Sequence, residues 1–466
     1  MAKLGDLGEV NRGRSRHRPR YAKHLYVGPY PFIQTGDIRA SGGRITAHSQ
    51  TYSDAGLAQS RLWPTGTMCI TIAANIAETA ILTYPACFPD SVVGFVADPV
   101  KANVYFIEYM FRKLRTSIQQ QASGSVQDNI NLATLDRLRF PIPSVPEQLA
   151  IANVLRALDD KIEQNRRTAQ ALELLARAIF HAWFVDFEPV KAKAAGATAF
   201  PSMPQSVFDA LPTRFVESDI GPVPEGWKVG AIKCLATISK AQINPQDRPE
   251  EFVDHFSLPA YDAEMRPTVE AGTAIKSNKF LVVPGCVLFS KLNPRIARVW
   301  LPPLVAGRRQ IASTEFLVFI PRQMSDRHYL YCQFQQTAFR EKLTQDASGT
   351  SNSHQRVRPD DVLNRPVIVP TAPIRIVFAG IADPLFALMS ENQDEAARLA
   401  TMRDYLLPKL LSGDSNWLDA GNRRYRFCNC RPARRFSERH RKRRSGSRSG
   451  WTVGARKRDR RSLCRT

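Results

Sequence analysis

The chain has 466 residues, of which 43% are hydrophobic, and a formal net charge of +22. This length is enough for about three domains with packed cores. No uninterrupted apolar run approaches the ~18 residues that a membrane-spanning helix needs, and the first residues do not resemble a signal peptide. The eight cysteines show no CxxC spacing. We therefore expect a cytoplasmic protein in a reducing compartment, with no membrane contact, no metal site and no cofactor.

Most of the positive charge lies at the C-terminal end. Residues 421–466 contain 18 Lys and Arg against two acidic residues, so the rest of the chain is only mildly basic. Residues 414–466 have no periodic apolar pattern, and we expect them to form a basic, disordered tail. The tail is either a basic arm that adds non-specific DNA affinity or the product of a reading-frame accident after Gly413-Asp414. The abrupt change of character favours the accident.

Residues 1–145 have the pattern of a mixed α/β domain. The segment NRGRSRHRPR, residues 11–20, is either a solvated loop or a phosphate contact, because guanidinium groups bind phosphate oxygens bidentately. Short β-type runs follow between residues 30 and 100, broken by Gly, Pro, Asn and Asp. A helical pattern over residues 103–121 then leads into the turn-rich segment ASGSVQDNIN.

Residues 146–186 are predicted to form one long helix. Ser144 and Glu147 form a capping box, and Pro146 lies in the first turn, where it costs no hydrogen bond. Apolar residues recur in steps of three and four from Ile151 to Trp183, which is the pattern of a coiled-coil seam. At ~1.5 Å per residue the helix would be roughly 58 Å long, so it should connect separate parts of the chain.

The second half of the chain repeats the first. Residues 187–224 are predicted to be a linker, residues 225–371 a second α/β domain and residues 372–413 a second long helix. The shift in residue number that carries Ile151 onto Phe378, called the repeat offset below, superimposes the seams of the two helices. It also carries the polar interruption Asn165 onto Asn392. The alternative is two unrelated core helices, but shared seam and shared interruption favour antiparallel partners whose asparagines set the register. Pro384 is expected to kink the second helix.

The predicted fold class is therefore α/β (α+β), with an internal tandem repeat of two similar domains separated by two long antiparallel coiled-coil helices. Two α/β domains (the heads) held apart by a rigid pair of helices (the spacer) suit a bipartite target such as duplex DNA with two separated half-sites. Because the heads differ in sequence, the two half-sites should differ as well.

Several segments together resemble the specificity (S) subunit of type I restriction-modification systems. They are PFIQTGDI (31–38), residues 68–82, FPIPSVPEQLAIANVLRALDDKIEQNR (140–166), GPVPEGWKV (221–229) and MRDYLLPKLLSGD (402–414). The resemblance covers roughly residues 1–414. The first domain lacks the Gly-Trp opening that Gly226-Trp227 give the second, which suggests a true start upstream of Met1. The second helix has Ile374-Arg375 where the first has Glu147-Gln148.

The resemblance implies a non-catalytic subunit that provides sequence specificity to a restriction endonuclease and adenine methyltransferase complex active in phage defence. Its two domains would be target recognition domains that read a bipartite double-stranded DNA sequence. Its helices would set the spacing and dock modification (methyltransferase) subunits, which restriction (translocase and nuclease) subunits would join.

No catalytic motif is visible in the sequence. It contains no phosphate loop of the form GxxxxGK[ST], no methyltransferase Asn/Asp-Pro-Pro-aromatic motif and no HExxH or Ser/His/Asp pattern. The remaining alternatives are a stand-alone two-headed DNA-binding or architectural protein and an undetected nuclease.

Candidate DNA contacts are basic and amide side chains in the loops. In the first domain they are Arg12, Arg14, Arg16 and Arg18 for phosphates, and Gln34, Thr35, Asn75, Gln127 and Asn129 for base edges. In the second domain they are Lys291, Asn293, Arg295, Arg298, Arg308, Arg309, Gln310, Asn352, His354 and Gln355. Amide side chains pair bidentately with adenine, but an ordinary surface role is as compatible with each single residue.

Overall fold

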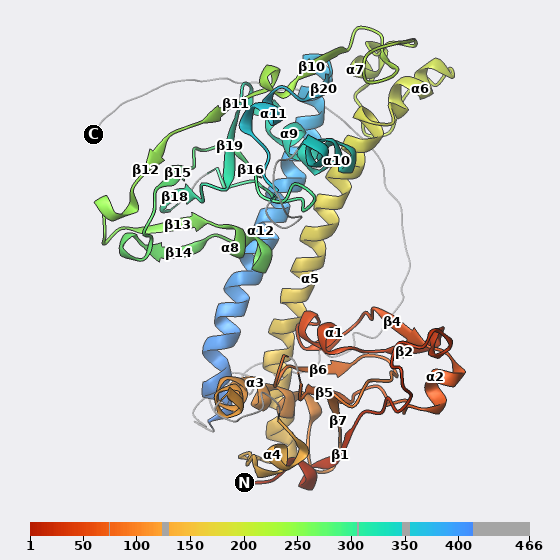
Figure 1. The fold of residues 1–466 in the computed structure, drawn as a ribbon, viewed down its shortest axis with the longest axis vertical. Coiled ribbons are helices and arrows are strands. Elements are labelled where there is room, and N and C mark those ends of the chain that lie inside the picture. The colour runs from red at the N-terminus through yellow and green to blue at the C-terminus, as the bar shows by residue number, and fades with distance from the viewer. Residues whose placement is uncertain (74, 124–129, 305–306, 347–354, 413–466) are drawn as a thin grey trace, which may run out of the picture. The chain divides into compact units, whose positions relative to one another are not determined.

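The structure, a computed structural model, describes residues 1–73, 75–123, 130–304, 307–346 and 355–412 (Figure 1). The predicted tail lies outside these ranges. Within them the chain folds as two α/β domains attached to two long helices that pack on each other, as the sequence predicted.

The first domain is built on a five-stranded sheet with the order β1-β7-β5-β6-β3. Its strands are β1 (Gly8–Arg12), β3 (Arg44–Ile45), β5 (Met68–Thr71), β6 (Thr79–Leu82) and β7 (Val92–Ala97). The strands pair antiparallel except for β3, which runs parallel to β6. Outside this sheet lie a two-stranded ribbon and four helices: β2 (Tyr26–Phe32), β4 (Gln50–Tyr52), α1 (Thr35–Ala40), α2 (Asp54–Ala58), α3 (Val104–Ser123) and α4 (Leu132–Arg137).

The second domain repeats this framework. Its sheet has the order β11-β19-β16-β17, which matches β1-β7-β5-β6, and every pair is antiparallel in both. These strands are β11 (Ala236–Ser239), β16 (Val287–Ser290), β17 (Val299–Trp300) and β19 (Phe316–Pro321). Helices α9 (Arg327–Gln335), α10 (Thr337–Asp346) and α11 (Pro359–Leu363) take the places of α3 and α4.

The two domains differ in what is added to the framework. The second has a mixed sheet of order β12-β15-β18-β13-β14 where the first has only the β2–β4 ribbon. Its elements are β12 (Gln242–Ile243), β13 (Phe252–Phe256), α8 (Leu258–Glu264), β14 (Thr268–Ala271), β15 (Lys279–Leu281) and β18 (Arg309–Ala312). A further ribbon joins β10 (Lys228–Ala231) to β20 (Pro366–Val369). The repeated framework is thus the part whose apolar core packs on the helices in both domains.

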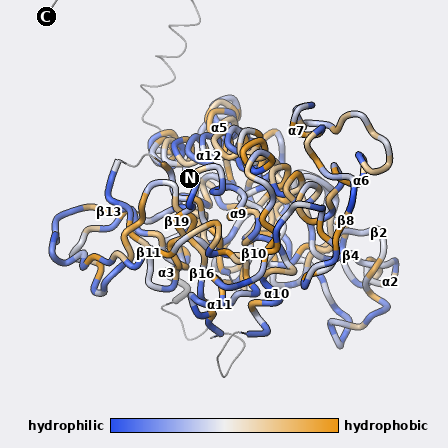
Figure 2. Tube along the Cα trace, turned by 90° about the horizontal axis from the view of Figure 1, so that it is seen from above, coloured by the Kyte–Doolittle hydropathy of each residue, from blue (hydrophilic) through white to orange (hydrophobic). Residues whose placement is uncertain are grey.

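Helix α5 (Val145–Phe184) begins as the sequence predicts. Ser144 is the N-cap, and its backbone N–H donates to the Glu147 carboxylate at 3.0 Å. Helix α12 (Ala372–Leu411) lies beside α5 in both views (Figures 1 and 2). The seam positions Ile151, Leu155 and Ile162 are buried.

The helices run antiparallel, and of the two asparagines predicted to set their register, Asn165 bonds across the seam and Asn392 does not. Asn165 donates from Nδ2 to Glu395 Oε2 at 2.7 Å, whereas Asn392 donates to the Leu388 carbonyl of its own helix. In an antiparallel pair, equivalent positions meet only where the pseudo-twofold axis crosses the seam. That crossing lies between Asn165 and Glu395, so Asn392 falls about one turn away from Asn165.

Each domain core takes residues from both helices. The first core contains Ile151 and Leu155 from the start of α5 together with Leu411 from the end of α12. The second core contains Phe378 and Phe184, which the repeat offset relates to Ile151 and Leu411. The tandem repeat is therefore closed by a pseudo-twofold arrangement in which each helix contributes one end to each domain.

The segment predicted as a linker is folded. It contains α6 (Glu188–Ala194), α7 (Gln205–Asp209) and a short ribbon of β8 (Phe215–Val216) with β9 (Val223–Pro224). Val190, Phe208 and Leu211 are buried in the same cluster as Trp227. Its Ala, Lys and Pro content concealed a few well-spaced apolar residues that pack on the second domain.

Helix α12 is the described helix that is long and apolar enough to cross a membrane by length and composition alone. Its apolar half contains two charged residues, Arg375 and Asp383, which form ion pairs with Asp326 and His328 of the second domain. Its apolar positions pack on α5, so the helix is a core element of the fold.

The helix is continuous through Pro384. Proline has no backbone N–H, so Pro384 cannot donate the helical hydrogen bond to the Gly380 carbonyl. Both residues are exposed. The predicted kink concerns curvature within this continuous helix and stays a prediction.

We predict that Asp326→Ala lowers the free energy of unfolding by about 3 kcal/mol, because it leaves the Arg375 charge buried without its partner. Urea denaturation measures the change. The control is Glu225→Ala, which removes the partner of Arg214 in a pair whose side chains are 77% and 46% exposed. This control should lose less than about 1 kcal/mol, and equal losses in the two variants would contradict the assignment.

We also predict that stability falls below pH 6.5. Burial lowers the pKa of His328 from 6.5, although its hydrogen bond with Asp383 opposes the shift. The unfolded chain therefore binds this proton first, so the contribution is complete above the unfolded pKa and is lost as pH falls through the folded pKa. Denaturation series from pH 8 to 5 should show a shallower decline for His328→Gln. His255, whose pKa burial also lowers, should keep part of the decline, and an unchanged slope in His328→Gln would sink the idea.

Candidate DNA interface

The basic segment of the first domain is an extended strand end with its arginines on the outside. Arg12, Arg14, Arg16 and Arg18 are exposed, whereas the intervening Gly13 and Ser15 are buried. Gly13 N–H donates to the Val92 carbonyl at 2.8 Å, and a Cβ at position 13 would meet the Phe88 carbonyl at 2.3 Å. The close approach of the backbone fixes this segment against the sheet and directs alternate side chains to solvent.

Three of these arginines are available for a ligand. Within the described ranges, Arg12, Arg14 and Arg16 form no ion pair or side-chain hydrogen bond. Arg18 instead donates to the Ser15 and His17 carbonyls at 2.7 and 2.9 Å. Arg18 therefore shapes the loop, and the other three present the positive charge.

The predicted base readers of the first domain lie around α1. Gln34 is its N-cap and donates from Nε2 to Gln50 Oε1 at 3.0 Å, and Thr35 is its first residue. Asn75, in the β5–β6 connection, accepts from Arg39 Nη1 of α1 at 2.9 Å. The fold thus brings Asn75 to the helix that Gln34 starts, and adds Arg39, which the sequence analysis missed.

In the second domain, two of the predicted residues meet in one place. Asn293, in the loop after β16, donates its backbone N–H to the Gln355 carbonyl at 2.8 Å. Asn293 has a φ of 52°, which is the left-handed region. The side-chain oxygens Oδ1 of Asn293 and Oε1 of Gln355 are buried without a hydrogen-bond partner. Lys291 precedes them in the same loop.

The other predicted arginines are mostly neutralised by acidic neighbours. Arg298 forms a bidentate pair with Asp262 at 2.7 and 2.8 Å, Arg308 pairs with Asp254 at 2.8 Å, and Arg309 pairs with Glu251 at 3.2 Å. Arg295 is exposed, and Gln310 on β18 is buried with an unpartnered Nε2. Acidic partners that lie far from the arginines in the sequence cannot be read from spacing. Gln127, Asn129, Asn352 and His354 lie outside the described residues.

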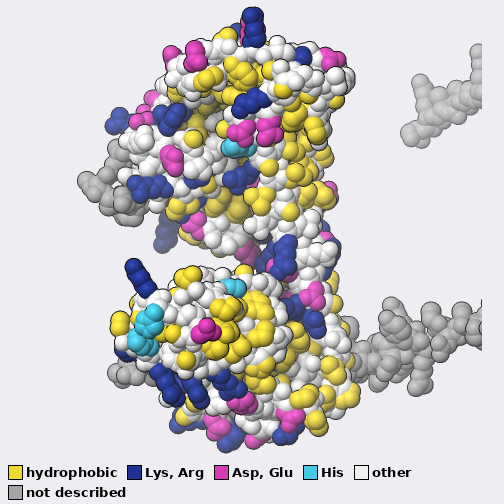
Figure 3. Space-filling view, turned by 90° about the vertical axis from the view of Figure 1, so that its right-hand side faces the viewer, with side chains coloured by type: hydrophobic (Ala, Val, Ile, Leu, Met, Phe, Trp, Pro, Cys, Tyr) yellow, Lys and Arg dark blue, Asp and Glu magenta, His cyan; other side chains and the backbone are white. Residues whose placement is uncertain are grey.

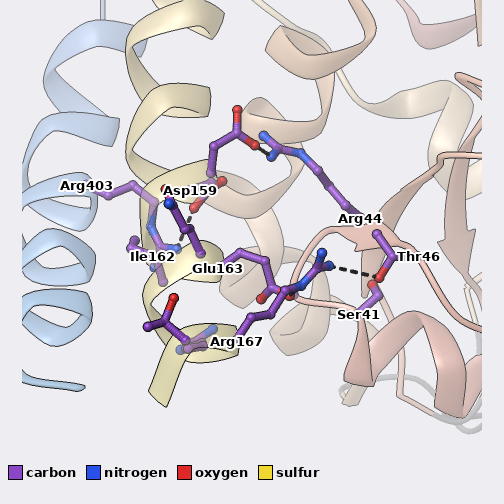
Figure 4. A pocket seen from close by; sticks show the side chains of 13 residues that line it. Ser41, Arg44, Thr46, Asp159, Ile162, Glu163, Arg167 and Arg403 are labelled. Carbon is purple, nitrogen blue, oxygen red and sulfur yellow. Dashed lines mark hydrogen bonds and ion pairs between the residues drawn. The ribbon is translucent and has the colours of Figure 1, made fainter. Parts of the chain in front are cut away.

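A junction at the middle of α5 was not predicted from the sequence. Here a cavity of about 410 Å³ is lined by residues of the α1–β3 connection and of both helices, as Figure 4 shows. Arg44 pairs with Asp160, and Arg167 donates to Thr46 Oγ1 at 3.4 Å. From the second domain, Glu264 lies 3.6 Å from Arg166, and Arg266 pairs with Asp394 at 3.1 Å.

Both domains therefore hold the spacer near its centre. The adjacent arginines after Asn165 were the available signal, because both contact residues of the flanking domains. On the face drawn in Figure 3, Lys and Arg side chains are interspersed with Asp and Glu side chains, which agrees with this extensive pairing.

A buried polar cluster joins the first domain to the helices beside this cavity. Asp159 of α5 accepts from Tyr109 Oη at 2.7 Å, from Arg112 Nη1 at 3.0 Å and from Arg403 Nη1 of α12 at 2.8 Å. Arg112 also donates to Glu108 at 2.6 Å. Burial alone would raise the pKa of Asp159, but the Arg112 charge and the Arg403 hydrogen bond outweigh it and lower the pKa. At Glu108 burial prevails and raises the pKa.

Known proteins share these features. Residues 1–174 match the family model "Type I restriction modification DNA specificity domain". The MjaIX specificity subunit of Methanocaldococcus jannaschii is 24% identical over 89% of this chain and 93% of its own length. The HindI specificity subunit of Haemophilus influenzae is 24% identical over 69% of this chain and 80% of its own.

A solved structure has the same fold. The type I restriction-modification S subunit from M. genitalium aligns with a TM-score of 0.55 and 14% identity, covering 88% of this chain and 95% of that one. The match includes two domains attached to packed long helices. Residues 1–174 thus match the type I restriction-modification DNA specificity domain, and the chain as a whole is similar to specificity (S) subunits of type I restriction-modification systems.

Proposed function

We propose that this chain reads an asymmetric, bipartite DNA target and positions it for partner modification and restriction subunits. The observation that carries the proposal is the contrast between frame and additions. The sheet order and the helices repeat, whereas the β2–β4 ribbon and the β12–β14 sheet do not. The repeated framework attaches both domains to the helices in the same way, and the different additions give the two domains different DNA-reading surfaces.

The available charges support DNA as the ligand of the first head. Arg12, Arg14 and Arg16 alternate along one edge, and each is free to neutralise a phosphate. Phosphate contacts position a protein on the duplex, whereas amide side chains such as Gln34 and Asn75 provide base readout.

The helices offer equivalent apolar positions for a pair of partner subunits. The repeat offset relates Leu149 to Ile376, which are 42% and 54% exposed. It also relates Leu175 to Met402, which are 49% and 52% exposed. Exposed apolar side chains that recur under the pseudo-twofold axis suit two copies of one partner. A stand-alone DNA-binding protein would have no use for this repetition.

The first test measures the spacer. One heptad is inserted into α5 between Asn165 and Arg166, and a matched one into α12 between Asp394 and Glu395, so that the inserts face each other. The chain is co-expressed with its modification subunits, and methylated bases are mapped across the host genome. The inserts add ~10.5 Å, so the gap should lengthen by about three base pairs while both half-sites stay the same.

Insertion into α5 alone is the control and should abolish methylation, because the seams no longer match. Altered half-sites with an unchanged gap would refute the spacer model. Failure of the wild-type chain to purify with modification subunits would refute the proposed assembly and favour a stand-alone DNA-binding protein.

The second test measures phosphate contact. Arg14→Ala in the assembled complex should weaken binding by a similar factor for every DNA sequence. It should also reduce the slope of log affinity against log salt by about 0.9, the share of one neutralised phosphate. Arg214→Ala is the matched control, because Arg214 is exposed but already pairs with Glu225 at 3.0 Å. Equal slopes for the wild type and Arg14→Ala would exclude Arg14 from the interface.

A further inference from the structure

The polar cluster at Asp159 has no counterpart in the second half of the chain. The repeat offset carries Asp159 to Phe386, and its reverse carries Arg403 to Ala176. Phe386 stacks on His328 with ring centroids 4.5 Å apart and meets Tyr331 edge-on at 5.1 Å. At this one position of the repeat, the contact between head and helix is thus ionic in the first half and aromatic in the second.

The polar cluster at Asp159, called the joint below, links several elements of the first head to both long helices. One carboxylate, on α5, accepts from two residues of α3 and from Arg403 of α12. Arg112 continues the chain of contacts to the Gly42 carbonyl at 3.2 Å, and Glu108 continues it to Thr79 of β6 at 3.0 Å. The sheet and the α1–β3 connection are therefore linked to both long helices through one connected set of side chains centred on Asp159.

The side chains of Arg112 and Asp159 are closely packed by their neighbours. Gly43, at a φ of 104°, leaves room for the Arg112 guanidinium, because a Cβ there would lie 1.8 Å from Nη2. The side chains of Arg112 and Asp159 are 15% and 10% exposed. Hydrogen bonds to a half-buried carboxylate are directional, so a rotation of the head would leave charged donors unpaired.

A small rotation at this joint would move the head by about one base pair. A domain of this size has a radius of gyration of roughly 15 Å, so its reading surface lies on the order of 20 Å from the joint. A turn of about 10° then displaces that surface by roughly 3.4 Å, which is the rise of one base pair.

We infer that Asp159 and its donors Tyr109, Arg112 and Arg403 are positioning residues that restrict the complex to one gap length between the half-sites. This inference rests on the proposed reading of a bipartite target. It adds that helix length alone does not define the gap, because the orientation of the first head contributes to it.

The test uses the full chain with its modification subunits and maps methylated sites by gap length. The variants are Tyr109→Phe, which removes one hydrogen bond, Arg403→Gln, which removes the contact from α12, and Asp159→Asn. Both half-sites should persist in each variant. Methylation at sites whose gap is one base pair longer or shorter should rise by about tenfold over the wild type, the discrimination of one charged hydrogen bond.

The matched control is Asp136→Asn, because Asp136 is a carboxylate of the first head that pairs with Lys3 of the same head, away from both long helices, and is 58% exposed. It should keep the wild-type gap. A role limited to stability would lower methylation at the native gap without creating new gaps, and that result in Tyr109→Phe and Arg403→Gln would overturn the inference. Should Asp159→Asn fail to fold, these two milder variants decide the question. A wild-type chain that yields no bipartite motif would instead refute the proposed function.

Discussion

The antiparallel seam between α5 and α12 is the interaction on which the rest of the structure depends. Its apolar positions hold the two helices together, and its ends supply residues to both domain cores. The cluster at the base of each domain is complete only with residues from both helices. The sheet order of the framework that packs on the helices is repeated in both domains, because the seam constrains its packing. The outer strands differ between the domains, because the seam does not constrain them.

The same constraint explains what could be predicted from the sequence. A heptad pattern with a capping box at Ser144 is local information, and it located the first helix to within a residue at its start and two at its end. The repeat offset predicted the second helix and the second domain, because a tandem repeat is visible wherever packing preserves its pattern. The antiparallel arrangement followed from the need to pair two such seams.

The parts that escaped prediction depend on residues that are distant in sequence. Asn165 pairs with Glu395 because the crossing of the helices, and not their internal similarity, selects its neighbour. The candidate DNA contacts Arg298 and Arg308 pair with Asp262 and Asp254, which come from other elements of their domain. The Asp159 cluster draws on three helices and was invisible for the same reason.

The contribution of Leu411 to the first core has a consequence for biosynthesis. The first domain emerges from the ribosome well before the second, yet the residues that cover its base are among the last to be made. Its folding therefore has a very high contact order and stays incomplete until α12 is synthesised. During that interval the apolar base of the first domain is uncovered, and a nascent chain interrupted before α12 would present it to chaperones or to aggregation.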